Sequence, residues 1–291
     1  GKGNDQVRFE LAIKAFLPDM PVIAPWRIWD IKGREEEIAY LRGHGVNIDF
    51  KTAEYSINQG IWGTSVGGKE TLTSSETLPE EAYPSQLKET QPRRVTLTFE
   101  KGEFVALDGK RFDDRIAAIQ ALQAIASRYA IGRDMHIGDT IIGIKGRVGF
   151  EAAAPMVIIK AHHMLEKHTL TKWQLYWKDQ ISAFYGNYLH EGQYYDPVMR
   201  DFEAFLESTQ RTVSGDVYVE LHPYRFVLVG IKSDHDLMSN KFGAYGETMN
   251  DSIYLRNGKV EDRYNITIKE ILTDNAQKDF TKSVTAGDNS F

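Results

Sequence analysis

The chain opens with a run of residues that could hold an amino acid. In Gly1-Lys2-Gly3-Asn4-Asp5, a glycine-bearing start leads directly into a helical pattern. Glycines let a ligand approach the backbone closely, and the free amide groups at a helix start can bind a carboxylate or a phosphate. Asp5 can accept from an α-ammonium group, and Arg8 can grip a carboxylate bidentately. The pattern predicts an amino-acid substrate, but a capped helix with a surface arginine fits the spacing equally well.

A second candidate lies in a glycine-rich stretch from Tyr55-Ser56 to Trp62-Gly63-Thr64-Ser65. Two serines in such a stretch, nine residues apart, could both direct hydroxyl groups at one polar ligand. Spacing alone favours an ordinary flexible loop here.

A cluster of three histidines and one glutamate has the side chains that could bind a metal ion. It consists of His162, His163, Glu166 and His168. His162 and Glu166 lie four residues apart on one predicted helix face, as metal ligands can. The cluster lacks the tight His-Glu-x-x-His spacing, and Lys160 and Lys167 flank it. A solvated helix face is therefore the favoured interpretation, and we expect no metal site.

Aromatic residues are dense between positions 173 and 195. They are Trp173, Tyr176, Trp177, Phe184, Tyr185, Tyr188, Tyr194 and Tyr195. A stacking platform for bases is one interpretation. Helical spacing and acidic neighbours favour packing in the core or between subunits instead.

Composition excludes several classes of protein. The 291 residues include 42% hydrophobic and 26% charged side chains, which is typical of a globular protein with one large or two modest domains. There is no cysteine, so disulfides, cysteine nucleophiles and cysteine-ligated metals are excluded. The net charge of −6 argues against a general polyanion-binding surface. No apolar run reaches the length of a transmembrane helix, and no Gly-x-Ser-x-Gly or Walker A pattern occurs.

The first part of the chain reads as alternating helices and strands. The periodicity predicts a helix over 5–17, a short buried strand over 21–24, a helix over 35–43 and a strand over 46–50. This alternation is the signature of an α/β layer. Residues 51–92 are rich in glycine, serine, threonine and proline, and we expect them to form a long loop.

The second part mixes hairpins with long helices, which predicts an α+β arrangement there. We expect a hairpin from strands 95–99 and 104–107, a helix over 113–130, a strand over 140–144, helices over 154–167, 171–189 and 197–211, and a hairpin from 217–221 and 226–229. The polar residues after 272 are expected to be a frayed tail. The predicted fold class is therefore α/β, with α+β character in the second domain.

Several linked segments of the chain resemble argininosuccinate synthases, in the order in which that family has them. The resemblance covers about residues 1–240, and the last 50 residues match poorly. The segments are Gly-Lys-Gly-Asn-Asp-Gln-Val-Arg-Phe-Glu (1–10), Val-Ile-Ala-Pro-Trp-Arg (22–27), Arg-Glu-Glu-Glu-Ile-Ala-Tyr (34–40), Tyr-Ser-Ile-Asn and Trp-Gly-Thr-Ser (within 55–65), Phe-Glu-Lys-Gly (99–102), Ala-Leu-Asp-Gly-Lys (106–110), Gly-Ile-Lys-Gly-Arg (143–147) and Ala-His-His-Met-Leu-Glu (161–166).

The resemblance implies a two-step ligase. ATP, with Mg²⁺, would adenylate the ureido oxygen of citrulline and release pyrophosphate. The α-amine of aspartate would then attack the activated carbon and expel AMP, giving argininosuccinate. The first step improves the leaving group, and the second requires two polar substrates to be held in line. No tightly bound cofactor is implied.

The resemblance also implies roles for individual residues. Asn4 is expected to contact both citrulline and aspartate, Asp5 to bind aspartate, and Arg8 to bind citrulline. Ser56 and Ser65 are expected to bind citrulline from the second domain.

This chain departs from the family pattern at three places. The Ser-Gly-Gly-x-Asp loop that holds ATP in the family does not occur in it. Gly138 stands where the family commonly has a glutamate, and Phe150 stands where it has a tyrosine. Both are citrulline contacts in the family, and neither glycine nor phenylalanine can supply the missing polar group.

Three successive segments are expected along the chain. Residues 1–47 are expected to be the end of an ATP-pyrophosphatase-type nucleotide-binding domain, 48–272 a synthetase domain, and 273–291 a polar tail. We expect a C-terminal portion of a longer enzyme that, lacking the ATP loop, makes no argininosuccinate alone. The family implies a cytoplasmic homotetramer that binds neither nucleic acid nor membrane. The alternatives are an inert substrate-binding or assembly module and another ATP-pyrophosphatase enzyme, although an acidic chain argues against an RNA substrate.

Overall fold

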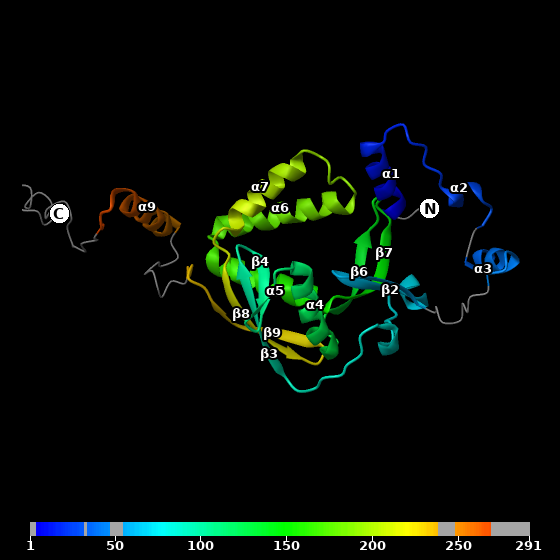
Figure 1. Ribbon diagram of the computed structural model, residues 1–291, viewed down its shortest axis with the longest axis horizontal. Helices are drawn as coiled ribbons and strands as arrows, with labels where there is room; N and C mark the ends of the chain where they lie inside the picture. The colour runs from blue at the N-terminus through cyan, green and yellow to red at the C-terminus, as the bar shows by residue number, and fades with distance from the viewer. Residues whose placement is uncertain (1–3, 32–33, 47–54, 238–247, 269–291) are drawn as a thin grey trace, which may run out of the picture. The chain divides into compact units, whose positions relative to one another are not determined.

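The computed structural model describes residues 4–31, 34–46, 55–237 and 248–268 (Figure 1). The chain divides into two compact units, Gly1–Leu237 and Met238–Phe291. The described part of the second unit contains the helix α9 (Thr248–Tyr264), and every other element named below belongs to the first unit. Among the described residues, no helix combines the length and the apolar character needed to cross a bilayer.

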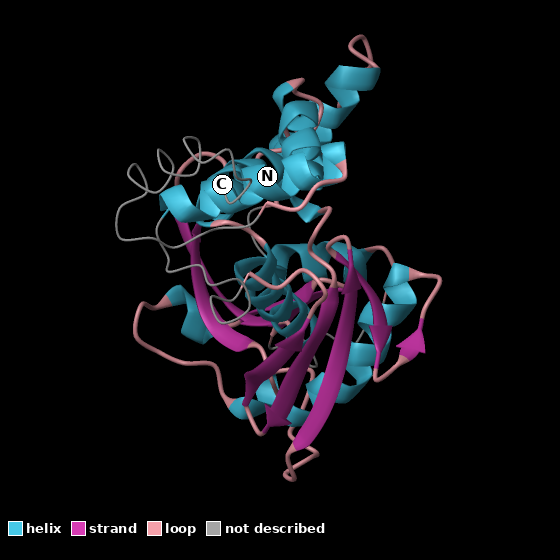
Figure 2. Cartoon of the chain, turned by 90° about the vertical axis from the view of Figure 1, so that its left-hand side faces the viewer, coloured by secondary structure: helices cyan, strands magenta, loops and turns pink. Residues whose placement is uncertain are grey.

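The larger sheet is antiparallel and has the strand order β5-β4-β3-β8-β9. Its strands are β3 (Arg93–Glu100), β4 (Glu103–Leu107), β5 (Lys110–Arg111), β8 (Gly215–His222) and β9 (Arg225–Lys232). Figure 2 shows strands running side by side as magenta arrows, with cyan helices beside them. The two helices that pack on this sheet are α4 (Arg115–Ala126) and α5 (Ala153–Thr169).

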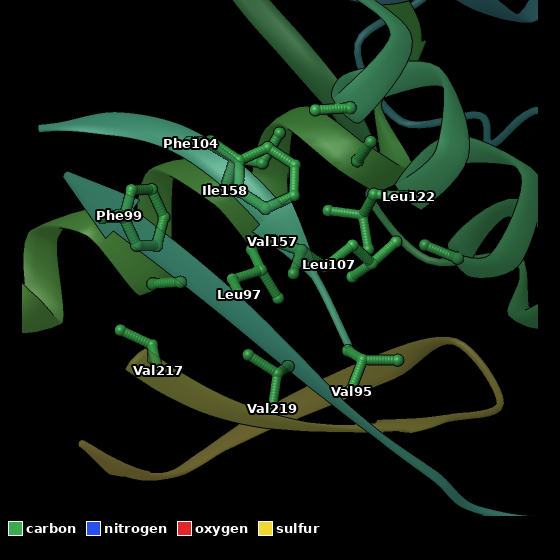
Figure 3. Packing of buried hydrophobic residues seen from close by; sticks show 14 of the residues in the cluster. Val95, Leu97, Phe99, Phe104, Leu107, Leu122, Val157, Ile158, Val217 and Val219 are labelled. Atoms are coloured by element: carbon green, nitrogen blue, oxygen red, sulfur yellow. The ribbon is translucent and has the colours of Figure 1, made fainter. Parts of the chain in front are cut away.

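The main hydrophobic core lies between this sheet and those two helices. Successive residues of a strand face opposite sides, so Val95, Leu97 and Phe99 of β3 all point inward and are at most 1% exposed. They meet Leu122 of α4 and Val157 of α5, both fully buried (Figure 3). The core therefore fixes α5 against the sheet, and α5 carries the histidine cluster.

The smaller sheet is also antiparallel and has the strand order β1-β2-β7-β6. Its strands are β1 (Ser56–Gly60), β2 (Gly63–Gly67), β6 (Arg133–Asp139) and β7 (Lys145–Glu151). One side of it packs on the short helices η2 (Lys69–Leu72) and η3 (Glu80–Ala82) and the chain around them, through a satellite core of Val66, Leu78 and Ala82. That packing leaves the other side open.

The remaining helices of the first unit are α1 (Asn4–Phe16), α2 (Pro25–Ile28), α3 (Arg34–Gly43), η4 (Ser127–Tyr129), α6 (Lys172–His190) and α7 (Val198–Gln210). Thr171 and Gln174 form a reciprocal capping box that begins α6. α6 packs on α7 through an edge-to-face contact of Tyr188 with Phe202, and the Tyr185 hydroxyl donates to Glu203 at 2.9 Å.

Most predicted elements are confirmed. The helices expected at 5–17, 35–43, 113–130, 154–167, 171–189 and 197–211 correspond to α1, α3, α4 with η4, α5, α6 and α7, and both expected hairpins form. The mixed fold class is confirmed as well, and the antiparallel sheets make the part after residue 55 α+β. Of the expected strand at 46–50, residues 47–50 lie outside the described residues, as does the tail at 273–291.

Three expectations about secondary structure are wrong. Residues 21–24 form no strand, and Ile23 is 75% exposed. Residues 140–144 form the turn between β6 and β7, because Thr140 exchanges hydrogen bonds with Ile144 and Gly143 has φ +79°. The stretch 51–92 is not one long loop, since it contains β1, β2, η2 and η3.

Candidate functional site

The open side of the smaller sheet gathers four of the expected citrulline positions. Ser56 pairs with Gly67 across β1 and β2, and Ser65 of β2 pairs with Phe150 of β7. Directly paired residues face the same side of a sheet, and so do residues two apart along a strand. The register therefore places Ser56, Ser65 and Phe150 on one side. Gly138 joins them because it pairs with Gly146, four residues before Phe150 on β7.

We call this side the open face. The register assigns to it Ser56, Asn58, Gly60, Gly63, Ser65, Gly67, Asp134, His136, Gly138, Gly146, Val148 and Phe150, none of which is buried. Glycines and serines predominate, so a ligand can approach the strand backbones closely. A Cβ at Gly63 would lie 2.4 Å from Cζ of Phe150, which shows that the ring lies over that glycine.

The opposite side of the same sheet is closed by its own chain. Arg147 donates to the carbonyl oxygens of Glu70, Thr73 and Glu76. Arg133 forms an ion pair with Glu80 at 2.7 Å, and the buried Glu151 accepts a hydrogen bond from the backbone amide of Ser85 at 3.3 Å. These contacts hold the segment 68–85 against that side, so within the described residues the open face is the side left for a ligand.

The first turn of α1 meets this sheet at the tip of the β6–β7 hairpin. Asn4 Oδ1 accepts a hydrogen bond from the backbone amide of Ile141 at 2.9 Å. Ile141 lies three residues beyond Gly138, at the end of the open face. The structure therefore brings the two sequence-predicted groups, Asn4 with its neighbours and the residues of the sheet, to adjoining positions.

Arg8 holds α1 to the C-terminal end of α6. Its Nε donates to the carbonyl oxygen of His190 at 2.8 Å, and its Nη2 lies 3.0 Å from Nδ1 of the same histidine. Nε2 of His190 in turn lies 3.1 Å from the carbonyl oxygen of Asp139, next to Gly138. A cation here also interacts favourably with the negative end of the α6 dipole.

The Arg8 guanidinium keeps part of its hydrogen-bonding capacity. A guanidinium has five N–H donors, and three are engaged, because Nη1 also contacts Asp5 Oδ1 at 3.1 Å. Within the described residues one N–H remains on each terminal nitrogen, and two terminal nitrogens of a guanidinium can bind one carboxylate bidentately. Asp5 itself is 84% exposed on its side chain, so its second oxygen can accept from a ligand.

Two residues near this site were not predicted from the sequence. His136 lies on the open face through the β6–β7 register, and His190 orients Arg8. The glycines at positions 60 and 63, on either side of Ile61-Trp62, were a usable signal for the turn of the hairpin. The pairing of that hairpin with residues 133–151, however, depends on tertiary register that no local pattern encodes.

The histidine cluster forms a buried ion-pair network rather than a solvated helix face. Glu166 is 0% exposed, so that interpretation is wrong for it. Lys178 Nζ lies 2.7 Å from Glu166 Oε2, and Gln210 donates to Oε1 at 2.9 Å. His163, Glu166 and Asp179 lie close enough together to share a cation, but the Lys178 ammonium already neutralises that carboxylate. His168 instead pairs with Asp236 at 3.2 Å.

The protonation of this network follows from burial and charge. Burial lowers the pKa of His162 more than the neighbouring Glu166 raises it, so His162 is uncharged at pH 7. Burial would raise the pKa of Glu166, but His162, Lys178 and Gln210 together hold that pKa below its ordinary value. At pH 7, where His162 is uncharged, Lys178 Nζ is the cation 2.7 Å from Glu166.

Tyr185 and Tyr188 of the aromatic stretch pack on α7, but most of its other rings are exposed, so packing in the core is wrong for those, and packing between subunits stays a prediction. α6 has no buried residue. Trp173, Tyr176, Trp177 and Phe184 are 50–56% exposed.

Two hollows within the described residues are lined by other parts of the first unit. One, at the ends of β8 and β9, is lined by Arg211, Ser214 and Lys232 among others. The other lies between Trp62 and the helices α4 and α5. Neither is lined by a residue of the open face.

Two family models match successive parts of the chain. Residues 1–47 match the model of the argininosuccinate synthase N-terminal HUP domain, and residues 55–264 match that of the argininosuccinate synthase C-terminal domain. These two matches give the class of the chain: a segment of a HUP domain followed by a synthase C-terminal domain.

The chain belongs to the argininosuccinate synthase family. It is 37% identical over 266 residues to the argininosuccinate synthase of Clostridium botulinum strain Eklund 17B, covering 88% of this chain and 64% of the relative. It is 37% identical over 247 residues to that of Dictyoglomus turgidum (84% and 62%), and 36% identical over 249 residues to that of Pyrococcus furiosus (84% and 60%). The chain thus spans about 60–64% of the length of these curated relatives.

Proposed function

We propose that this chain takes part in the ATP-dependent ligation of citrulline and aspartate to argininosuccinate, with a citrulline adenylate as the intermediate and AMP and pyrophosphate as the other products. The observation that carries the proposal is the convergence of Ser56, Ser65, Gly138 and Phe150 on one open face. α1, with Asn4 and Arg8, is anchored at the end of that face. Family membership supports the same reaction.

In this proposal the two amino-acid substrates lie along the open face and its end at α1. Arg8 binds the carboxylate of citrulline through its two remaining N–H groups, and Ser56 and Ser65 bind other polar groups of the same substrate. Asn4 contacts both substrates, and Asp5 receives the α-ammonium group of aspartate. About 14 Å of strand separates Gly146 from Phe150 at about 3.4 Å per residue. The two ends of the open face therefore contact different groups of the ligands.

ATP enters as a substrate, and Mg²⁺ accompanies its phosphates, as is usual for nucleotide sites. We assign no protein ligands to that ion. The one cluster found among the described residues, His163, Glu166 and Asp179, fits it poorly. Mg²⁺ prefers an octahedron of oxygen ligands, whereas this cluster offers a histidine nitrogen and already holds the Lys178 ammonium. We propose no tightly bound cofactor.

We also propose that the protein is a cytoplasmic homotetramer that binds neither nucleic acid nor membrane. The exposed aromatics of α6 support association, because four large side chains at 50–56% exposure form a surface of the kind that marks protein interfaces. The net charge of −6 gives no support for binding to a polyanion.

Light scattering is expected to give a mass about four times the 33.1 kDa of one chain at micromolar concentration. Trp177→Ser, on the exposed side of α6, should shift the distribution toward smaller species. A folded protein that scatters only as a 33.1 kDa species would contradict the tetramer.

The proposed function is tested by calorimetric titration of the chain with L-citrulline, with L-ornithine as the matched control. We expect saturable binding of citrulline at one site per chain and much weaker binding of ornithine, which replaces the ureido group by a charged amine. Equal binding of the two amino acids, or no binding of citrulline at millimolar concentration, would contradict the proposal.

A further inference from the structure

The imidazole of His136 lies over Gly138, two residues further along β6. A Cβ built on Gly138 would lie 2.7 Å from Nε2 of His136 and 3.3 Å from its Cδ2. Real side chains do not approach so closely, so the ring occupies the space that a side chain at position 138 would need. The absence of a side chain at Gly138 is therefore what allows His136 to adopt this position.

His136 is directed toward the open face and is free to interact there. It pairs with Val148 in the β6–β7 register, and the same register puts it on the side of Ser65 and Phe150. Its side chain is exposed. No hydrogen bond or ion pair engages the ring within the part of the chain that the structure describes. Asp134, two residues before it, is the nearest charged residue of β6 on that face.

We propose that His136 is a substrate-contacting residue that hydrogen-bonds the ureido group of citrulline. This inference rests on the proposed function. An imidazole can donate from one ring nitrogen and accept at the other. A ureido group carries both a carbonyl acceptor and N–H donors, so the two are complementary. His136 thereby supplies, from a neighbouring position, a polar group that Gly138 and Phe150 cannot provide.

The geometry also makes Gly138 a determinant of the position of the ring. A methyl group at residue 138 meets only the far end of a flexible side chain, so Gly138→Ala would displace the imidazole without disturbing the backbone. Gly138→Ala should then lower the affinity for citrulline because it displaces the His136 ring. Two variants that act through one contact are not additive, which a double-mutant cycle detects.

The test is a calorimetric titration of the full chain with L-citrulline. His136→Ala and Gly138→Ala should each weaken binding about 5- to 20-fold, the usual range for a lost hydrogen bond to a ligand. The double variant should bind no more weakly than the weaker single variant. His136→Asn, which retains one donor and one acceptor, should recover part of the affinity. His235→Ala is the matched control, since His235 is another exposed histidine and follows β9 of the other sheet, and it should bind within about twofold of the parent.

The titrations distinguish a failure of the inference about His136 from a failure of the proposed function. If the parent binds citrulline and His136→Ala binds it within about twofold, the inference is overturned and the proposed function stands. Additive losses in the double variant would also overturn it, because Gly138 would then act independently of His136. If the parent itself binds no citrulline, the proposed function fails first. Unfolding midpoints of all variants within a few degrees of the parent show that the comparison concerns binding and not folding.

Discussion

Lys178→Met is expected to lower the free energy of unfolding by about 3–5 kcal/mol at pH 7, which is the usual cost of removing one partner of a buried ion pair. Glu166 is 0% exposed and would keep a charge with no cation beside it, since burial leaves His162 neutral. The Gln210 amide, His163 at 3.3 Å and His162 at 3.7 Å would remain beside the carboxylate. Denaturant titration of the two proteins measures the difference.

The same variant should change how stability depends on pH. In the parent, the pKa of Glu166 is lowered in the folded state. The stabilisation from this group is therefore present above its unfolded pKa and is lost as pH falls through the folded one. Removing Lys178 takes away one of the groups that lower this pKa, so the folded-state pKa of Glu166 should rise toward or above its ordinary value, and protonation of Glu166 should stabilise the variant. The difference in the free energy of unfolding between the parent and Lys178→Met should be largest near pH 7 and should decrease toward pH 4.

Two further variants make this prediction specific. Lys145→Met removes an exposed ion pair with Asp139, at 2.6 Å, and should cost under about 1 kcal/mol. Glu166→Gln combined with Lys178→Met removes both charges and should recover most of the lost stability. A double variant no more stable than Lys178→Met alone would show that the packing of Lys178, and not its charge, is what matters.

Arg8→Ala is expected to weaken binding of citrulline by about 30-fold to several thousand-fold, or on the order of 2–5 kcal/mol. The reason is the pair of unengaged N–H groups on Nη1 and Nη2, which together fit a carboxylate. Arg8→Lys should recover only part of the loss, because an ammonium group cannot form the paired contact. Calorimetric titration with L-citrulline measures all three proteins.

Arg8 also fastens α1 to α6, so the loss of that contact has to be separated from the loss of a ligand contact. His190→Ala removes one of the Arg8 interactions but leaves the guanidinium and the bond to the His190 carbonyl in place. It should weaken citrulline binding less than about tenfold. If His190→Ala were as damaging as Arg8→Ala, Arg8 would act only by positioning the helix. If Arg8→Ala binds citrulline within twofold of the parent, Arg8 is a surface residue that does not contact the substrate, and the prediction is wrong.

Local patterns predicted the elements whose own residues decide their structure. The helices and both hairpins of the larger sheet followed from periodicity, because a buried face with period 3.6 or 2 is written in consecutive residues. The strand at 140–144 was predicted wrongly because Ile141, Ile142 and Ile144 look like a buried run. In the folded chain Ile142 and Ile144 are 60% and 58% exposed, at the turn where α1 meets the hairpin.

Only part of the candidate site could be predicted from the sequence. Asn4, Asp5 and Arg8 are close together in the chain, so a short pattern was enough to single them out. The pairing of β2, β7 and β6 is what brings together Ser65, Phe150 and His136. If one strand were shifted by one residue in this register, its side chains would face the opposite side of the sheet. The buried Glu166 was missed because lysines flank it in sequence, although its partners Lys178 and Gln210 come from other helices.

Mapping the citrulline site by NMR tests the central claim most directly. The backbone amide resonances of the isotope-labelled chain would be followed during a titration with L-citrulline. We predict that the largest changes cluster on the open face and its end at α1, at Ser65, His136, Gly138 and Phe150 together with Asn4. Changes concentrated instead around Ser214 and Lys232, in the hollow of the larger sheet, or no saturable changes at millimolar citrulline, would contradict the account.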